Sequence, residues 1–103
     1  MVINGKELNF KVSKRSDAAN FEKAIKDMAE KEKEIQKMDK NSLSEILGAL
    51  EDMFRDFFVA ATGIDVVDTC DDLEEIKGMY YTFLKEVEKQ KKAFLAAASV
   101  KGK

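Results

Sequence analysis

Apolar and polar residues alternate at the start of the chain, over residues 1–12. Val2 and Ile3 lead into Asn4-Gly5, the dipeptide that best tolerates the two positive φ angles of a type I′ turn. After the turn, every second residue is apolar: Leu8, Phe10 and Val12. A period of two predicts a strand with one buried face, so residues 1–12 are expected to form a β-hairpin. Two strands alone are barely stable in water, and the hairpin must therefore lie on helices or pair with another chain.

The rest of the chain follows the helical period, with apolar residues three or four positions apart. Three such stretches predict helices over residues 16–38, 42–62 and 70–95, followed by a flexible tail over residues 96–103. No linker-like composition interrupts them. The prediction is therefore a single, mainly α domain over residues 1–103, in which the N-terminal β-hairpin packs on a three-helix bundle.

The three helices differ in their apolar stripes. The helix over residues 42–62 is the most apolar and is expected at the centre of the bundle, with a broad stripe made of Leu43, Ile46, Leu47, Leu50, Met53, Phe54, Phe57, Phe58 and Ala61. In the first helix, Glu32 interrupts the stripe, so its second half is expected to project from the domain or to fray. The third helix carries a heptad seam made of Leu73, Ile76, Tyr80, Phe83, Val87, Gln90 and Phe94. That seam weakens where Gln90 enters it.

Residues typical of helix ends lie near each predicted boundary. Ser42, with Glu45 three residues later, has the spacing of a capping box, and Gly63 is well placed as a left-handed C-cap. The candidate N-caps of the other two helices are Ser16 or Asp17, and Thr69 or Asp71. Between the second and third helices, Val66-Val67 is expected to tuck under a helix end.

Charged residues make up 37% of the 103 residues, which favours long, solvated helices. The charge is uneven: residues 41–75 hold ten carboxylates against Arg55 alone, and residues 76–103 hold seven lysines against two glutamates. These segments are able to attract each other within one molecule or between copies. The basic end is thin and lacks arginine, so nucleic-acid binding is not expected. With no apolar run near the ~20 residues that cross a bilayer, we expect no membrane segment and a cytoplasmic location.

The residue inventory argues against catalysis. The chain has no histidine, and Cys70 is its only cysteine, so Ser-His, Cys-His and thiolate-cluster chemistry have no residues to use. The carboxylate pairs Asp71-Asp72 and Glu74-Glu75 are typical of a helix start, where the dipole favours acids. We therefore expect no enzyme activity, and no catalytic, metal or cofactor site. Cys70 is expected to be a small packing side chain, with a reactive thiol as the alternative.

Four residues of the third helix do not fit the core pattern. Met79 and Tyr81 flank the apolar stripe, and Phe94 and Leu95 lie beyond the strong part of the heptad seam. Met and Tyr are enriched at protein interfaces, so these four residues are the candidate protein contacts, for a partner or for a homo-oligomer. For Met79 and Tyr81, the alternative is that neighbouring lysine stems partly shield them.

The order of these signals resembles a known protein family. An Ile-Asn-Gly-Lys-Glu stretch at residues 3–7 opens the hairpin, Asp56-Phe57-Phe58 precedes Gly63, and Asp72-Leu73 starts a final helix with a lysine-rich end. This order resembles small tail-region proteins of siphophages and prophages of Gram-positive bacteria, which are regarded as tail assembly chaperones. The similarity covers residues 2–92. The linker before the third helix lacks the Gly-Thr-Ala-Lys-Lys-like start of that family.

The resemblance implies a non-enzymatic role in the cytoplasm of the host bacterium. Such proteins are thought to bind the tape measure protein, and tail tube subunits, before the tube polymerises. A tape measure is a long helical chain with apolar stripes that aggregate unless they are covered. An amphipathic helix with an incompletely buried stripe covers such a surface by helix-in-groove packing. The alternative reading is a structural or adaptor helical protein, such as a virion tail component or a coiled-coil subunit.

Overall fold

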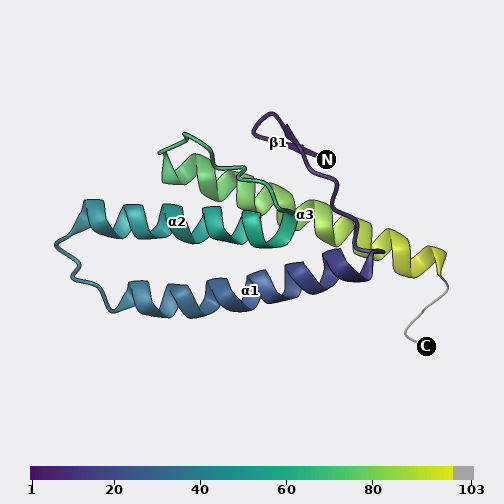
Figure 1. The fold of residues 1–103 in the computed structure, drawn as a ribbon, viewed down its shortest axis with the longest axis horizontal. Helices are drawn as coiled ribbons and strands as arrows, with labels where there is room; N and C mark the ends of the chain where they lie inside the picture. The colour runs from purple at the N-terminus through teal and green to yellow at the C-terminus, as the bar shows by residue number, and fades with distance from the viewer. Residues whose placement is uncertain (99–103) are drawn as a thin grey trace.

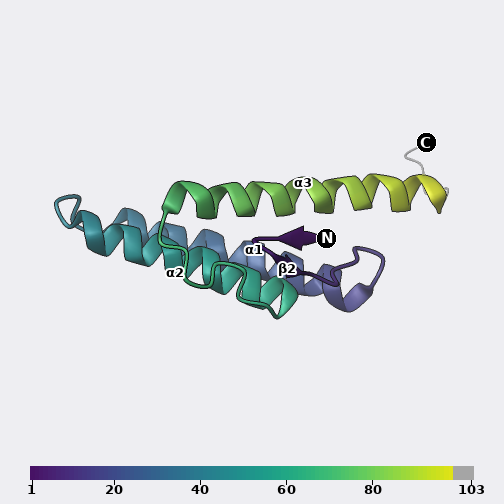
Figure 2. The same cartoon turned by 90° about the horizontal axis from the view of Figure 1, so that it is seen from above.

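The computed structural model describes residues 1–98 and has the element order β1 (Val2–Ile3), β2 (Lys6–Glu7), α1 (Arg15–Gln36), α2 (Leu43–Thr62) and α3 (Leu73–Ala97). It confirms the predicted fold class: a mainly helical chain with an N-terminal two-stranded hairpin packed against the helices (Figure 1). Helices α1 and α2 form a long antiparallel hairpin, and α3 packs on α2 from one side (Figures 1 and 2). The closed end of the α1–α2 hairpin extends beyond the start of α3 in both views.

The N-terminal hairpin pairs within the chain. Val2 lies opposite Glu7 and Ile3 opposite Lys6 in an antiparallel register. Asn4 and Gly5 have φ angles of 53° and 73°, as the predicted type I′ turn requires. The predicted extent of 1–12 was wrong, because β2 ends at Glu7.

Leu8 still pairs across the hairpin, since its N–H donates to the Met1 carbonyl at 2.7 Å, but the backbone after Leu8 has no strand to pair with. The alternation of burial nevertheless continues beyond the ladder. Leu8 and Phe10 are buried, whereas Asn9 and Lys11 are exposed. The alternation of apolar and polar residues therefore predicted correctly which side chains are buried, but it overestimated the length of the paired strands.

The helix ends correct several cap predictions. Lys14 precedes α1 without a side-chain cap, and Asp17 instead accepts a hydrogen bond from the Lys11 backbone N–H at 3.0 Å. Ser42 precedes α2 but makes no capping hydrogen bond, so the predicted capping box does not form. The N-cap of α3 is Asp72, whose carboxylate accepts from the Glu74 N–H at 2.9 Å. Thr69 and Asp71 do not cap this helix.

Two further predictions about the helices have clear outcomes. Gly63 adopts the left-handed conformation, with φ 79°, and its N–H donates to the Val59 carbonyl at 2.8 Å, as predicted for the end of α2. The second half of α1 projects with the hairpin tip but does not fray, because Ile35 is buried against the apolar residues near it. Ala96 and Ala97, predicted to be tail residues, belong to α3, and residues 99–103 of the predicted tail lie outside the described residues.

Aromatic rings from every layer meet in the core. The Phe83 ring on α3 contacts four others with centroid separations of 5.3–6.0 Å: Phe10, Phe21, Phe57 and Phe58. Phe57, Phe58 and Phe83 are almost completely buried. Three of these pairs are edge-to-face and the pair with Phe21 is tilted, and together they join the N-terminal segment, α1, α2 and α3 into one packed cluster.

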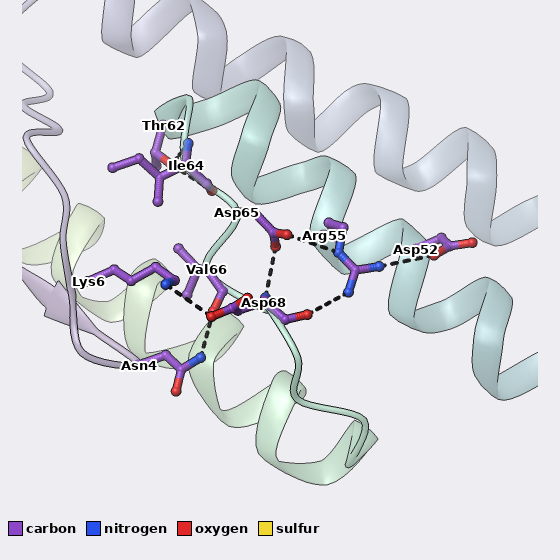
Figure 3. A network of polar contacts seen from close by, with 9 residues as sticks. All are labelled: Asn4, Lys6, Asp52, Arg55, Thr62, Ile64, Asp65, Val66 and Asp68. Carbon is purple, nitrogen blue, oxygen red and sulfur yellow. Dashed lines mark hydrogen bonds and ion pairs between the residues drawn. The ribbon is translucent and has the colours of Figure 1, made fainter.

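The connection between α2 and α3 is held from two sides (Figure 3). Val66 and Val67 are fully buried, as predicted. The Asn4 side chain donates to the Val66 carbonyl at 2.7 Å, which fastens the hairpin turn to the connection. On the other side, the Arg55 guanidinium donates to the Asp68 carbonyl at 2.9 Å and pairs with Asp65 at 3.3 Å. The connection is therefore a fixed part of the fold that sets the position of α3.

Candidate contact grooves along α1 and α3

The four predicted contact residues lie at three different positions along α3, with Phe94 and Leu95 together and Tyr81 and Met79 apart from them. Tyr81, Phe94 and Leu95 remain 54%, 45% and 36% exposed, which is high for large apolar or aromatic side chains. Met79 is only partly exposed and packs against the core. The four residues therefore do not form one patch, and Met79 stands apart from the other three.

Phe94 and Leu95 lie in an open groove near the C-terminal end of α3. This Phe94 groove has a volume of about 440 Å³ and is lined mainly by apolar side chains: Phe10, Val12, Ala18, Phe21, Glu22, Val87, Lys91, Phe94 and Leu95. Among the described residues, Glu22 and Lys91 are the only charged ones in its lining. Sequence periodicity places Phe94 and Leu95 outside the core, but it does not show that residues 10–22 supply the rest of the groove.

The Phe94 groove is open because of where α2 ends. Helix α3 continues past the end of α2, so its last turns have no α2 beneath them (Figures 1 and 2). The N-terminal segment takes that place. Gln90 holds it there, since its side-chain oxygen accepts from the Val12 N–H at 3.1 Å and its Nε2 donates to the Phe10 carbonyl at 3.3 Å. Two residues that line the groove are thus fixed to α3 by one polar side chain.

Tyr81 lies in a second groove, toward the N-terminal half of α3. This Tyr81 groove has a volume of about 260 Å³ and combines residues of all three helices: Met28, Glu32, Leu50, Met53, Phe54, Leu73, Lys77, Tyr80 and Tyr81. Burial raises the pKa of the Tyr80 phenol above its ordinary value of 10.0, and the neighbouring Tyr81 and Glu32 raise it further. Glu32, which interrupts the apolar stripe of α1, therefore faces this groove and not the core.

The two grooves share the same two helical walls. In the Phe94 groove, residues 18–22 of α1 face residues 87–95 of α3, and in the Tyr81 groove, residues 28–32 face residues 73–81. The residue numbers rise along one wall as they fall along the other, so the walls run antiparallel. The Cα atoms of α1 and α3 stay more than 8 Å apart, although α3 packs closely on α2. We call this partly open boundary, with its two grooves, the α1–α3 seam.

Another exposed apolar pair was missed in the sequence. Leu43 and Leu47 were assigned to the core stripe of the second helix, yet they are 65% and 37% exposed. They lie at the start of α2, where the hairpin tip extends past α3 and no third helix covers it (Figure 2). Helical periodicity identifies the face on which they lie, but it does not indicate where the covering helix begins.

The other residues considered for chemistry, Cys70 and the carboxylates near the start of α3, do not form a common site. Cys70 is partly buried against the core, with its Sγ 3.6 Å from Glu75 Oε1. Asp72 serves as a helix cap. Over residues 1–98, no three His, Cys, Asp or Glu side chains gather closely enough to hold a metal ion. Within the same range, no helix combines the length and apolarity that spanning a membrane requires.

The grooves of the α1–α3 seam are therefore the features of the described chain that best fit a binding role. Both are open: the Phe94 groove is lined mainly by apolar side chains, the Tyr81 groove mixes apolar and polar ones, and each includes large side chains that the core leaves exposed. No protein-family model, curated protein or solved structure matches the chain.

Proposed function

We propose that this protein is a non-enzymatic tail assembly chaperone, which binds the tape measure protein or the tail tube protein of a bacteriophage through the α1–α3 seam. The proposal combines the resemblance at residues 3–7, 56–58 and 72–73 with the open seam. The single observation that carries it is the exposure of three large side chains, Tyr81, Phe94 and Leu95, along one boundary between two helices. The proposed site of action is the cytoplasm of the host bacterium, before the tail is assembled.

The dimensions of the seam suit a helical client. Tyr81 and Phe94 are thirteen residues apart on α3, which at 1.5 Å per residue is about 20 Å. An amphipathic client helix of about four turns would therefore reach from one groove to the other. Such a helix places apolar anchors at positions i, i+3 or i+4, and i+7, which is the pattern read by a hydrophobic groove. Covering those anchors would keep a tape measure from aggregating.

The proposal is tested by co-expressing the full chain with the tape measure protein encoded near its gene. We expect the two proteins to co-purify, and the yield of soluble tape measure to rise. The variant Phe94→Ser should lose most of the captured tape measure, whereas Val59→Ser, at an exposed position of α2 outside both grooves, should not. The absence of a tape measure gene from the neighbourhood, or equal capture by both variants, would contradict the proposal.

One observation favours a second candidate, a structural coiled-coil subunit. Leu73, Tyr80, Val87 and Phe94 recur every seven residues, and the last of them is still exposed. A permanent subunit would sediment as an oligomer at low concentration and would be detected in purified phage particles by mass spectrometry. A chaperone would be absent from those particles.

A further inference from the structure

We infer that the Phe94 groove selects an amphipathic helix whose apolar stripe is flanked by acidic residues. This inference rests on the proposed function and deepens it, because it states the chemistry of the client segment. Two observations carry it: the composition of the groove lining, and the charges that the fold gathers around it.

The fold brings two basic segments to the same groove, although they are far apart in sequence. Lys91 lines the groove, and Lys92 follows it on α3. On the opposite wall, Lys14 and Arg15 lie about one helical turn before the lining residue Ala18. The hydrogen bonds of Gln90 to residues 10 and 12 fix the N-terminal segment beside α3, so both sets of cations are held near one apolar surface.

These cations have no carboxylate partner within the described chain. Across residues 1–98, the ion pairs involve the N-terminus, Lys6, Lys23, Lys31 and Arg55, and none includes Lys14, Arg15, Lys91 or Lys92. The carboxylates beside these four cations are Asp17 and Glu22 on α1 and Glu88 on α3, about one turn before Lys91 and Lys92. Glu22 lines the groove and Asp17 accepts the Lys11 N–H, which leaves four cations against three carboxylates. The rim therefore carries a net positive charge that an acidic ligand would neutralise.

A second copy of this chain fits the groove less well than a separate helical client. Docking of two Phe94 ends against each other would bring both sets of lysines and arginines together, which is electrostatically unfavourable. Among the described residues, the other exposed large apolar or aromatic side chains of a copy are Val2, Val59, Tyr81 and the pair Leu43 and Leu47. None of these supplies the three or more anchors along one helix face that groove binding uses. A client helix with a continuous stripe supplies them.

Electrostatic selection by a surface rim has a characteristic salt dependence. The cations remain in contact with solvent, so their attraction for a client falls as the Debye length shortens from about 14 Å at 0.05 M salt to about 4 Å at 0.5 M salt. Burial of apolar side chains in the groove does not weaken with salt in this way. The preference for acidic flanks should therefore become much smaller at high salt, while binding itself persists.

The test uses two fluorescein-labelled helical peptides of about 18 residues with the same leucine stripe, one with glutamates and one with lysines at the flanking positions. Fluorescence anisotropy with the full chain should show about tenfold tighter binding of the acidic peptide at 0.05 M salt and a much smaller ratio at 0.5 M salt. Phe94→Ser should weaken binding of both peptides by about tenfold. Lys91→Glu should weaken only the acidic peptide, by about two- to fivefold.

Several results would overturn the inference. Equal affinity for the two peptides, or an unchanged affinity for the acidic peptide in both Phe94→Ser and Lys91→Glu, would show that this groove does not select acidic helices. Concentration-dependent dimerisation of the chain that Phe94→Ser abolishes would assign the groove to a second copy. Circular dichroism of each variant checks that it is folded.

The outcomes also separate this inference from the proposed function. Capture of the tape measure by a chain that shows no preference between the peptides would disprove only the charge selection. A clear preference for the acidic peptide without capture of the tape measure would disprove only the role in tail assembly.

Discussion

The backbone N–H of Val12 donates a hydrogen bond to the side chain of Gln90, across 3.1 Å and 78 residues of sequence. The Nε2 group of the same Gln90 side chain donates to the Phe10 carbonyl. One side chain therefore provides hydrogen-bond partners for a backbone N–H and a backbone carbonyl of a segment that has no strand partner. A polar residue within the heptad seam thus replaces the missing β-ladder. It also positions Phe10 and Val12, which line the Phe94 groove.

Replacing Gln90 should therefore affect both stability and binding. We expect Gln90→Ala to lower the free energy of unfolding by about 1–2 kcal/mol, because two partly buried backbone groups lose their partner. Urea denaturation followed by circular dichroism measures this, and Lys89→Ala, on the exposed side of the same helical turn, is the control. If the two variants were equally stable, the proposed link between α3 and the N-terminal segment would be wrong.

Two phenylalanines of α3 should separate stability from binding. Phe83 is fully buried and contacts four other rings, so Phe83→Ala should lower the free energy of unfolding by about 3–5 kcal/mol. Phe94 is 45% exposed, so Phe94→Ala should lower the free energy of unfolding by only about 1 kcal/mol or less. The same substitution should weaken binding of the client helix. Thermal and urea unfolding of the two variants make the comparison. A large loss of stability on replacing Phe94 would instead indicate a core role for that residue.

Replacement by alanine should have opposite effects on stability at two glycines, Gly63 at the end of α2 and Gly48 inside it. Gly63 has φ 79°, and an added Cβ meets no atom within 4 Å, so Gly63→Ala costs only the backbone strain, about 1 kcal/mol. Gly48 lies inside α2 and also has free space around it. Gly48→Ala should stabilise the protein by about 0.5–1 kcal/mol, because alanine favours the helix. Denaturation midpoints that shift in the same direction would contradict this assignment of the α2 boundary.

Stability should fall at alkaline pH in part because of Tyr80. Its pKa is raised in the folded protein, chiefly by burial, so the folded state keeps the phenol proton at a pH where the unfolded state has lost it. Its contribution is complete below pH 10.0 and declines as the pH rises toward the folded-state pKa. Tyr80→Phe should therefore lose less stability than the wild type between about pH 9 and pH 11. Tyr81→Phe removes only the smaller contribution of Tyr81 to this pKa, so it should change the decline less than Tyr80→Phe does. An identical decline in all three proteins would exclude the effect.

Local chemistry predicted much of the fold. The Asn4-Gly5 turn, the left-handed Gly63 and the buried Val66-Val67 pair each follow from a few neighbouring residues. The N-caps were harder to predict, because several residues at each helix start are able to cap it. At α1, for example, Asp17 accepts a hydrogen bond from the Lys11 backbone, six residues earlier, and does not cap the helix.

The grooves depend on information that periodicity does not contain. The heptad seam predicted that Phe94 would lie beyond the core, and this is confirmed by its exposure. The position of α3 relative to α2 follows from the connection that Asn4 and Arg55 hold, and no local pattern encodes that offset. The offset leaves Leu43 exposed at one end and opens the Phe94 groove at the other.

The most direct test of the binding role is a two-dimensional NMR titration of the ¹⁵N-labelled chain with the acid-flanked leucine-stripe peptide. We expect the chemical-shift changes to follow the α1–α3 seam, with the largest at Phe94 and Leu95, smaller ones at Tyr81, and none at Val59. Changes confined to the hairpin tip at Leu43 and Leu47, or no changes at peptide saturation, would contradict the claim that the seam is a docking site for helical clients.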